Sequence, residues 1–63
     1  MSKADLVSHL RSHDCLLIRQ GKHEIWFNPS KQMTSPVPRH QLIDRVLVKK
    51  IFRELGIPNP PGF

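Results

Sequence analysis

The sequence predicts an α+β fold, α-β-β-β-α, in which two helices pack on one face of a three-stranded antiparallel sheet. Two observations favour this class. Apolar residues recur with a helical period near both ends of the chain, whereas the middle holds short runs of β-branched, aromatic and aliphatic residues. Short turn-forming segments separate these runs, and short links join antiparallel strands rather than parallel ones. The middle of the chain is therefore expected to form a meander that the two helices cover.

The length of the chain limits how much it can enclose. With 63 residues, it is expected to form a single domain, 1–57, followed by a flexible, proline-rich tail, 58–63. A domain of this size buries only about 60% of the surface that its unfolded chain exposes. Any functional site should therefore be an open groove or a sheet face rather than a deep pocket for a large cofactor.

The first element is expected to be a helix over residues 1–12. Ser2 and Asp5 have the spacing of an N-terminal capping box, with aspartate in place of the more usual glutamate. Helical spacing places three apolar residues on the face that docks on the rest of the domain: Leu6, Val7 and Leu10.

Two strands are expected next, over residues 15–20 and 23–28, joined by Gly21 and Lys22. Glycine at the first position of a two-residue hairpin loop accepts the positive φ of a type II′ turn. Such a turn sets four cross-strand pairs: Gln20 with His23, Arg19 with Glu24, Ile18 with Ile25, and Leu17 with Trp26. The opposite charges of the second pair weakly support this register.

The second half of the chain predicts a strand and a helix. A turn at 28–31 leads into a third strand, about 32–37. Because proline cannot donate to a neighbour, Pro36 predicts that this strand lies at an edge of the sheet or ends early. Asp44 is expected to cap the last helix, which Gly56 ends. The apolar face of this helix follows a helical period: Leu47, Val48, Ile51, Phe52 and Leu55.

The net charge of the chain indicates which kinds of partner it is expected to bind. Ten Lys and Arg residues outnumber five Asp and Glu, which gives a formal net charge of +5. This balance is typical of a protein that binds a nucleic-acid backbone, of one that binds an acidic protein, or simply of a basic surface. The single cysteine, Cys15, cannot form an intrachain disulfide. With no apolar segment near the ~20 residues that span a bilayer, and no signal-peptide core, we expect a cytoplasmic protein without a membrane partner.

His23 is the leading candidate for chemistry. RNA carries its own nucleophile, the ribose 2′-OH, so its cleavage chiefly requires a group that moves protons near neutral pH and cations that hold the phosphate. Histidine supplies the first, and the nearby Lys22 and Arg19 are candidates for the second. Arg39 and His40, before the last helix, are further candidates for phosphate contacts. From spacing alone, however, an exposed histidine beside a turn with no role is the simpler interpretation.

A metal site is not expected. The potential ligands lack the paired spacing of a structural zinc site: His9, His13, Cys15, His23 and His40. No phosphate-binding loop or dinucleotide motif occurs either. We therefore expect neither a metal nor a small-molecule cofactor.

Three segments together resemble the HicA (YcfA-like) toxins. They are LLIRQGKHEIWFNP (16–29), VPRH (37–40) and DRVLVKKIFRELGIP (44–58). The most specific features are the Gly-x-His step after the first strand, the VPRH segment and the closing Leu-Gly-Ile. The ordered set spans nearly the whole chain, from the opening helix to Pro58.

The resemblance implies a fold, an activity and a partner. Members of this family have an α-β-β-β-α fold like that of double-stranded-RNA-binding domains, and they cleave mRNA as toxins of type II toxin–antitoxin systems, with no metal implied. The histidine of the Gly-x-His step, here His23, is the catalytic residue, and a HicB-type antitoxin covers the active surface. Lys22 and Glu24 depart from the common Gly-Ser-His pattern: the lysine adds a phosphate-binding group, and the glutamate adds a negative charge near the RNA.

Together, these observations predict an mRNA-cleaving endoribonuclease with His23 as general acid or base. Four residues are expected to contact the RNA: Arg19, Lys22, Arg39 and His40. Two alternatives stay open, a non-catalytic RNA-binding module of the same fold and a basic interaction protein for an acidic partner. Salt-sensitive RNA binding without cleavage is expected of the first, and binding of a protein without RNA affinity of the second.

Overall fold

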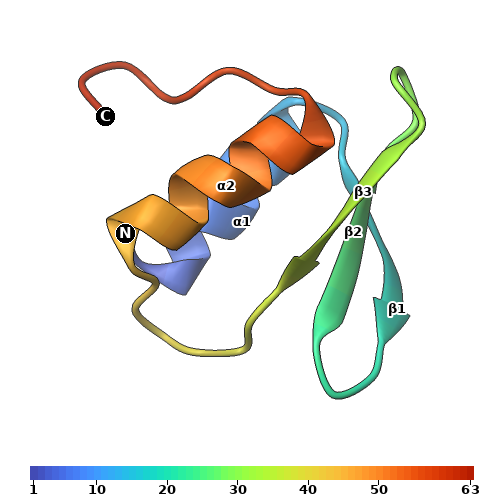
Figure 1. Ribbon diagram of the computed structural model, residues 1–63, viewed down its shortest axis with the longest axis horizontal. Helices are drawn as coiled ribbons and strands as arrows, with labels where there is room; N and C mark the ends of the chain where they lie inside the picture. Colours follow the sequence, from blue (N-terminus) through green and yellow to red (C-terminus); the bar gives the residue numbers. More distant parts are fainter.

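The computed structural model describes residues 1–63 and contains two helices and a three-stranded antiparallel sheet (Figure 1). The elements follow the predicted order: α1 (Lys3–Ser12), β1 (Leu16–Gln20), β2 (Glu24–Asn28), β3 (Met33–Val37) and α2 (Arg45–Leu55). The strands lie in the order β1-β2-β3 across the sheet, and both helices lie on the same side of it. The predicted fold class is therefore confirmed. Neither helix has the length and apolar character required to cross a membrane.

The first helix begins at its predicted cap. The backbone N–H of Asp5 donates to Ser2 Oγ over 3.1 Å, which satisfies one of the amide groups that the start of a helix leaves free. Leu6 and Leu10 are fully buried in the core, and Val7 is half-buried beside them. The predicted apolar face of α1 is therefore the face that packs.

The hairpin between β1 and β2 differs from the prediction. The observed pairs are Leu16 with Phe27, Leu17 with Trp26, Arg19 with Ile25, and Gln20 with Glu24. Only the Leu17–Trp26 pair matches the predicted register. The connecting turn has three residues, 21–23, rather than two, and an irregularity at Ile18 takes up the extra residue in β1.

The turn does not have the geometry that the sequence predicts. Gly21 does not have the positive φ that a type II′ turn requires, and its N–H donates to the His23 carbonyl oxygen over 3.3 Å. Trp26 is only 1% exposed, so its burial determines which residues of β2 face the helices. Glu24 shares that face, because residues two apart in a strand point to the same side. The extra residue in β1 places Arg19 opposite Ile25, on the other face, so the predicted Arg19–Glu24 pair is wrong.

The helices cover one face of the sheet and leave the other open. Trp26 and Asn28 of β2, and Ser35 and Val37 of β3, are buried on the covered face. The Asn28 side-chain Nδ2 donates to the carbonyl oxygen of Leu55 over 2.7 Å, which ties the end of β2 to the end of α2. The burial pattern of β2 and β3 thus assigns their residues to the two faces of the sheet.

The last two elements match the sequence closely. β3 pairs only with β2, which leaves Pro36 on an edge strand as predicted. α2 begins after Asp44, although the Asp44 side chain makes no capping hydrogen bond. The residues that α2 buries are among those predicted from spacing: Val48, Ile51, Phe52 and Leu55.

The core and the C-terminal segment meet at α2. Eleven buried apolar residues from the helices, strands and connecting segments form one cluster. The segment 58–63 runs back along α2 (Figure 1), with the Phe63 ring centroid 6.0 Å from that of Phe52. The Arg45 guanidinium lies 4.9 Å from the centroid of the Phe63 ring. The flexibility of this segment stays a prediction.

Gly56→Ala is expected to destabilise the domain by about 1–2 kcal/mol, because Gly56 ends α2 in the left-handed region. Its φ is 70°, a conformation that a side chain disfavours. An added Cβ would also stand 2.7 Å from Lys31 Cδ and 3.0 Å from Met33 Sδ. Urea unfolding followed by tryptophan fluorescence should show a lower midpoint with an unchanged m value.

Gly21→Ala is the matched control for this substitution. Gly21 lacks a positive φ, and a Cβ there would meet no atom closer than 4.0 Å. Its free energy of unfolding should therefore change by less than about 0.5 kcal/mol. Equal losses at the two glycines would contradict the assignment of backbone strain to Gly56.

Candidate active site at the hairpin turn

His23 is the last residue of the turn between β1 and β2. The turn residues Gly21, Lys22 and His23 are all exposed. The His23 imidazole forms neither an ion pair nor a hydrogen bond within the chain, in contrast to His9, which contacts a backbone carbonyl. The imidazole therefore meets solvent directly and is free to exchange a proton with a bound molecule.

Two of the predicted RNA-binding residues are near His23 in the hairpin. Lys22 precedes it in the turn, and Arg19 lies near the end of β1. Both are exposed, and neither side chain takes part in an ion pair or hydrogen bond. Because Arg19 faces Ile25, it lies on the sheet face that the helices leave open. Both cations are therefore available to an anionic ligand.

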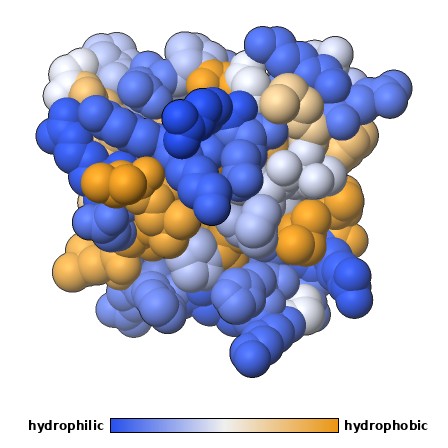
Figure 2. Space-filling model, in the orientation of Figure 1, coloured by the Kyte–Doolittle hydropathy of each residue, from blue (hydrophilic) through white to orange (hydrophobic).

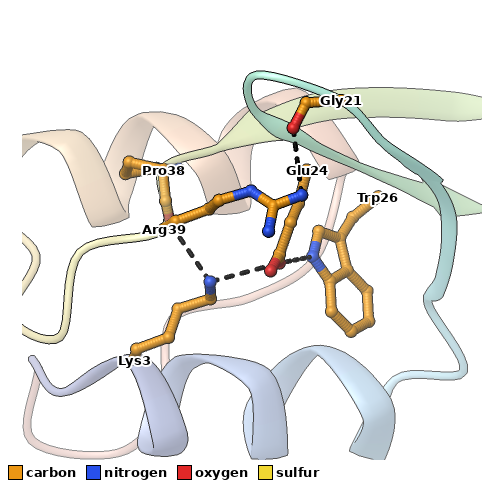
Figure 3. Close-up of polar contacts among 6 residues, drawn as sticks. All are labelled: Lys3, Gly21, Glu24, Trp26, Pro38 and Arg39. Atoms are coloured by element: carbon orange, nitrogen blue, oxygen red, sulfur yellow. Dashed lines mark hydrogen bonds and ion pairs between the residues drawn. The ribbon is translucent and has the colours of Figure 1, made fainter.

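The fold brings Arg39 to the turn from a distant part of the chain. Its Nη2 donates to the Gly21 carbonyl oxygen over 2.9 Å (Figure 3). A guanidinium has five N–H groups, so this single bond leaves others available. His40 is exposed next to Arg39, but no hydrogen bond joins it to the turn. Of the two residues predicted in this segment, only Arg39 contacts the turn.

The carboxylate of Glu24 is directed toward α1. Its Oε1 accepts a hydrogen bond from Trp26 Nε1–H over 3.0 Å and forms an ion pair with Lys3 Nζ at 3.1 Å (Figure 3). The side chains of Glu24 and Lys3 are only 16% and 19% exposed. The sequence predicted that Glu24, opposite Arg19, places a negative charge near the RNA; the structure instead pairs its carboxylate with Lys3 between the sheet and α1.

The Glu24 carboxyl is ionised at neutral pH in this setting. Burial by itself would raise its pKa, but hydrogen bonds from Trp26 and Lys3, together with the positive charges of Lys3 and Arg39, outweigh burial and lower the pKa below its ordinary value. A carboxyl with a lowered pKa is a steady hydrogen-bond acceptor and not a general acid near pH 7. Glu24 thus has the properties of a structural anchor.

Sequence reasoning missed three of these contacts. The Glu24–Trp26 bond has a local signal, because strand residues two apart share a face. The Lys3–Glu24 ion pair has no local sequence signal, because Lys3 comes from α1 and Glu24 from β2. The bond between Arg39 and Gly21 also has no local signal, because it depends on the path of the segment that connects β3 to α2.

His9, His13 and Cys15 take no part in the contacts at the turn. The rings of His9 and His13 are 4.7 Å apart, and His9 Nε2 lies 2.8 Å from the Pro58 carbonyl oxygen. No three His, Cys, Asp or Glu side chains gather as metal ligands would. Cys15 is buried, and this burial, with the charge of Asp14, raises the pKa of its thiol. A protonated, buried thiol is a core group rather than a nucleophile.

A second group of free cations lies on α2. Three exposed basic residues have no ion-pair or hydrogen-bond partner: Lys49, Lys50 and Arg53. Two of them, Lys49 and Arg53, line an open groove between α2 and the segment that follows it. The surface on this side is largely hydrophilic and carries separate apolar patches (Figure 2). α2 therefore adds positive charge that is separate from the turn in sequence.

The fold and the site define a small basic α-β-β-β-α protein that presents a free histidine among unpaired cations, an arrangement suited to a polyanionic partner. A profile of the family described as the HicA toxin of bacterial toxin–antitoxin systems matches residues 4–57. The chain therefore belongs to the HicA toxin family, as its sequence resemblance indicated, and membership implies an antitoxin partner. Neither the curated proteins nor the solved structures include a match to the chain.

Proposed function

We propose that this protein is an endoribonuclease that cleaves mRNA, with His23 as its general acid or base. The observation that carries the proposal is the exposed His23 imidazole, which has no partner in the chain and lies on a turn bonded to Arg39. Histidine is the side chain that most often transfers protons in enzyme catalysis. Membership of a toxin family supports the same conclusion.

The proposed reaction uses the nucleophile that RNA already carries. The 2′-oxygen attacks the adjacent phosphorus and loses its proton, and the bond from phosphorus to the 5′-oxygen breaks. The departing 5′-oxygen takes up a proton, so the products are a 2′,3′-cyclic phosphate and a 5′-hydroxyl. His23 moves one of these two protons, a role that typically contributes about 10²–10⁴-fold in rate. The scheme includes no metal.

The cations near the turn are proposed to hold the phosphate. Negative charge grows on the phosphate oxygens as the 2′-oxygen attacks, so fixed positive groups stabilise the transition state more than the substrate. Lys22 and Arg19 are free for this role, and Arg39 keeps unused N–H groups beside its bond to Gly21. His40, next to Arg39, is proposed to contact the RNA outside the reacting bond.

A HicB-type antitoxin is proposed to neutralise the protein by covering this turn. The turn is exposed and basic, so an acidic surface on the antitoxin would be attracted to it and would exclude RNA from His23. Such a partner would explain why the chain leaves its cations unpaired.

An RNA with one 2′-deoxy nucleotide immediately 5′ of the preferred cleavage bond is expected to resist cleavage at that bond. Without the 2′-OH the nucleophile is absent, so the product band should vanish, while other bonds of the same oligonucleotide are cut as before. Denaturing gels of end-labelled RNA measure this directly, and the unmodified oligonucleotide is the control. Continued cleavage that leaves a 5′-phosphate would show that water is the nucleophile and would contradict the scheme.

The second candidate function is a non-catalytic RNA-binding module. The unpaired cations of α2 favour it, because they are suited to phosphate contacts and lie on an element other than the His23 turn: Lys49, Lys50 and Arg53. Affinity that falls steeply with salt, without any cleavage, would select this function. Protein binding without RNA affinity would instead select a basic interaction protein.

A further inference from the structure

The His23 turn is held at both ends by side chains from outside the hairpin. At the first end, Arg39 Nη2 donates to the Gly21 carbonyl oxygen over 2.9 Å. At the second end, the Glu24 carboxylate forms an ion pair with Lys3 of α1 at 3.1 Å (Figure 3). Without these contacts, a turn of three exposed residues would be joined to the domain only through its two strands.

The side chains that hold the turn are themselves anchored. Lys3 Nζ also donates to the carbonyl oxygen of Pro38 over 3.1 Å, and Pro38 precedes Arg39 in the chain (Figure 3). The backbone N–H of Lys3 donates to the Gln41 carbonyl oxygen over 2.8 Å. The segment that carries Arg39 is thus tied to the start of α1, which limits the positions that the guanidinium can take.

The second end of the turn is connected to the core. The Glu24 oxygen that pairs with Lys3 also accepts the Trp26 Nε1–H over 3.0 Å, and the Trp26 side chain is almost entirely buried. Hydrogen bonds to an ionised carboxylate are about twice as strong as those between neutral groups. The residue that directly follows His23 is therefore fixed to both the sheet and α1.

We propose that Arg39 and the Lys3–Glu24 pair are positioning residues for His23. They hold the backbone on each side of the imidazole: Lys3 and Glu24 do so without touching the reacting atoms, and Arg39 does so in addition to its proposed phosphate contact. This inference rests on the proposed function, because it assigns the three residues to the chemistry of His23. A displacement of a catalytic group by about 1 Å can lower the rate on the order of 100-fold. A turn held at both ends keeps the His23 imidazole in position for the reaction.

Substitutions of Glu24 distinguish an anchor from a charge that repels RNA. Glu24→Ala is expected to lower the single-turnover rate constant for cleavage by about 10- to 100-fold, with unchanged affinity for a 2′-deoxy analogue of the RNA. Glu24→Gln keeps an oxygen that can accept from Trp26 and Lys3, so it should recover most of the rate. If both variants instead cleaved faster and bound RNA more tightly, the positioning role would be overturned.

Asp44→Ala is the matched control for the loss of one negative charge. The Asp44 side chain is exposed and makes no capping hydrogen bond, and Asp44 lies in the segment that leads to α2. We expect its cleavage rate and RNA affinity to stay near those of the wild type. A decrease as large as that of Glu24→Ala would overturn the inference, since net charge would then explain both.

Backbone relaxation provides a test that needs no RNA. In Glu24→Ala and in Arg39→Ala, the amide order parameters of Lys22 and His23 should fall from about 0.85 to below about 0.6, and Asp44→Ala should leave them unchanged. Arg39→Ala removes an exposed contact, so its spectrum away from the turn should remain that of the wild type. Unchanged order parameters in both variants would overturn the positioning role. A loosened turn in a protein that cleaves no RNA would overturn the proposed function alone.

Discussion

Replacing His23 with alanine is expected to lower the rate of RNA cleavage by about 10²–10⁴-fold and to leave the fold intact. The imidazole is exposed and has no partner in the chain, so its removal should change the free energy of unfolding by less than about 0.5 kcal/mol. Single-turnover cleavage of labelled RNA measures the first effect, and urea unfolding measures the second. In cells, regulated expression of the variant should no longer arrest growth or deplete mRNA.

His40→Ala separates the loss of chemistry from the loss of binding. Its side chain is also an exposed imidazole, but it is proposed to contact RNA rather than to move a proton. We therefore expect weaker RNA affinity and a rate close to that of the wild type once the RNA is saturating. A folded His23→Ala protein that cleaves as fast as the wild type would exclude His23 as the general acid or base.

The order of the elements follows from local signals, whereas the hairpin register does not. Ser2 and Gly56 act on backbone groups next to them in the chain, so the start of α1 and the end of α2 can be located from sequence. At the hairpin, Gly21 favours a two-residue turn, whereas the structure has a three-residue turn and a bulge between Leu17 and Arg19. Leu17 pairs with Trp26 in both arrangements, so the burial of Trp26 fits either one and does not select between them.

The candidate site is predictable in its residues and not in its geometry. Lys22 and His23 are neighbours in the chain, so any hairpin between these strands exposes them together. The contact of Arg39 with Gly21 depends instead on a connection that crosses from β3 to α2. The same limit applies to Glu24, whose ion-pair partner, Lys3, comes from another element. Local sequence therefore identifies the chemical groups, and the tertiary fold determines how they are held.

Phe52→Ala is expected to destabilise the domain by about 3–5 kcal/mol, the usual cost of removing a buried phenyl ring. Phe52 is 1% exposed and belongs to the single core cluster. Its ring also contacts the ring of His9 at 4.8 Å between centroids. A domain with 63 residues has a net stability of about 3–9 kcal/mol, taken at roughly 0.05–0.15 kcal/mol per residue. The expected loss is a large part of that stability, so the variant should unfold at a much lower temperature than the wild type, as thermal unfolding followed by far-UV circular dichroism would show.

Val46→Ala on the same helix shows whether this effect comes from burial. Val46 is 75% exposed, and alanine has a higher helix propensity than valine, so the free energy of unfolding should change by less than about 0.5 kcal/mol. The comparison also matters for the cleavage assays, because a domain with a small core can lose little free energy of unfolding before it unfolds. If Phe52→Ala still unfolded cooperatively near the wild-type midpoint, the core would tolerate the loss of this buried ring. Substitutions of exposed residues at the His23 turn would then not be expected to impair folding. If it unfolds as expected, the stability of every turn variant must be measured before its loss of cleavage is assigned to chemistry.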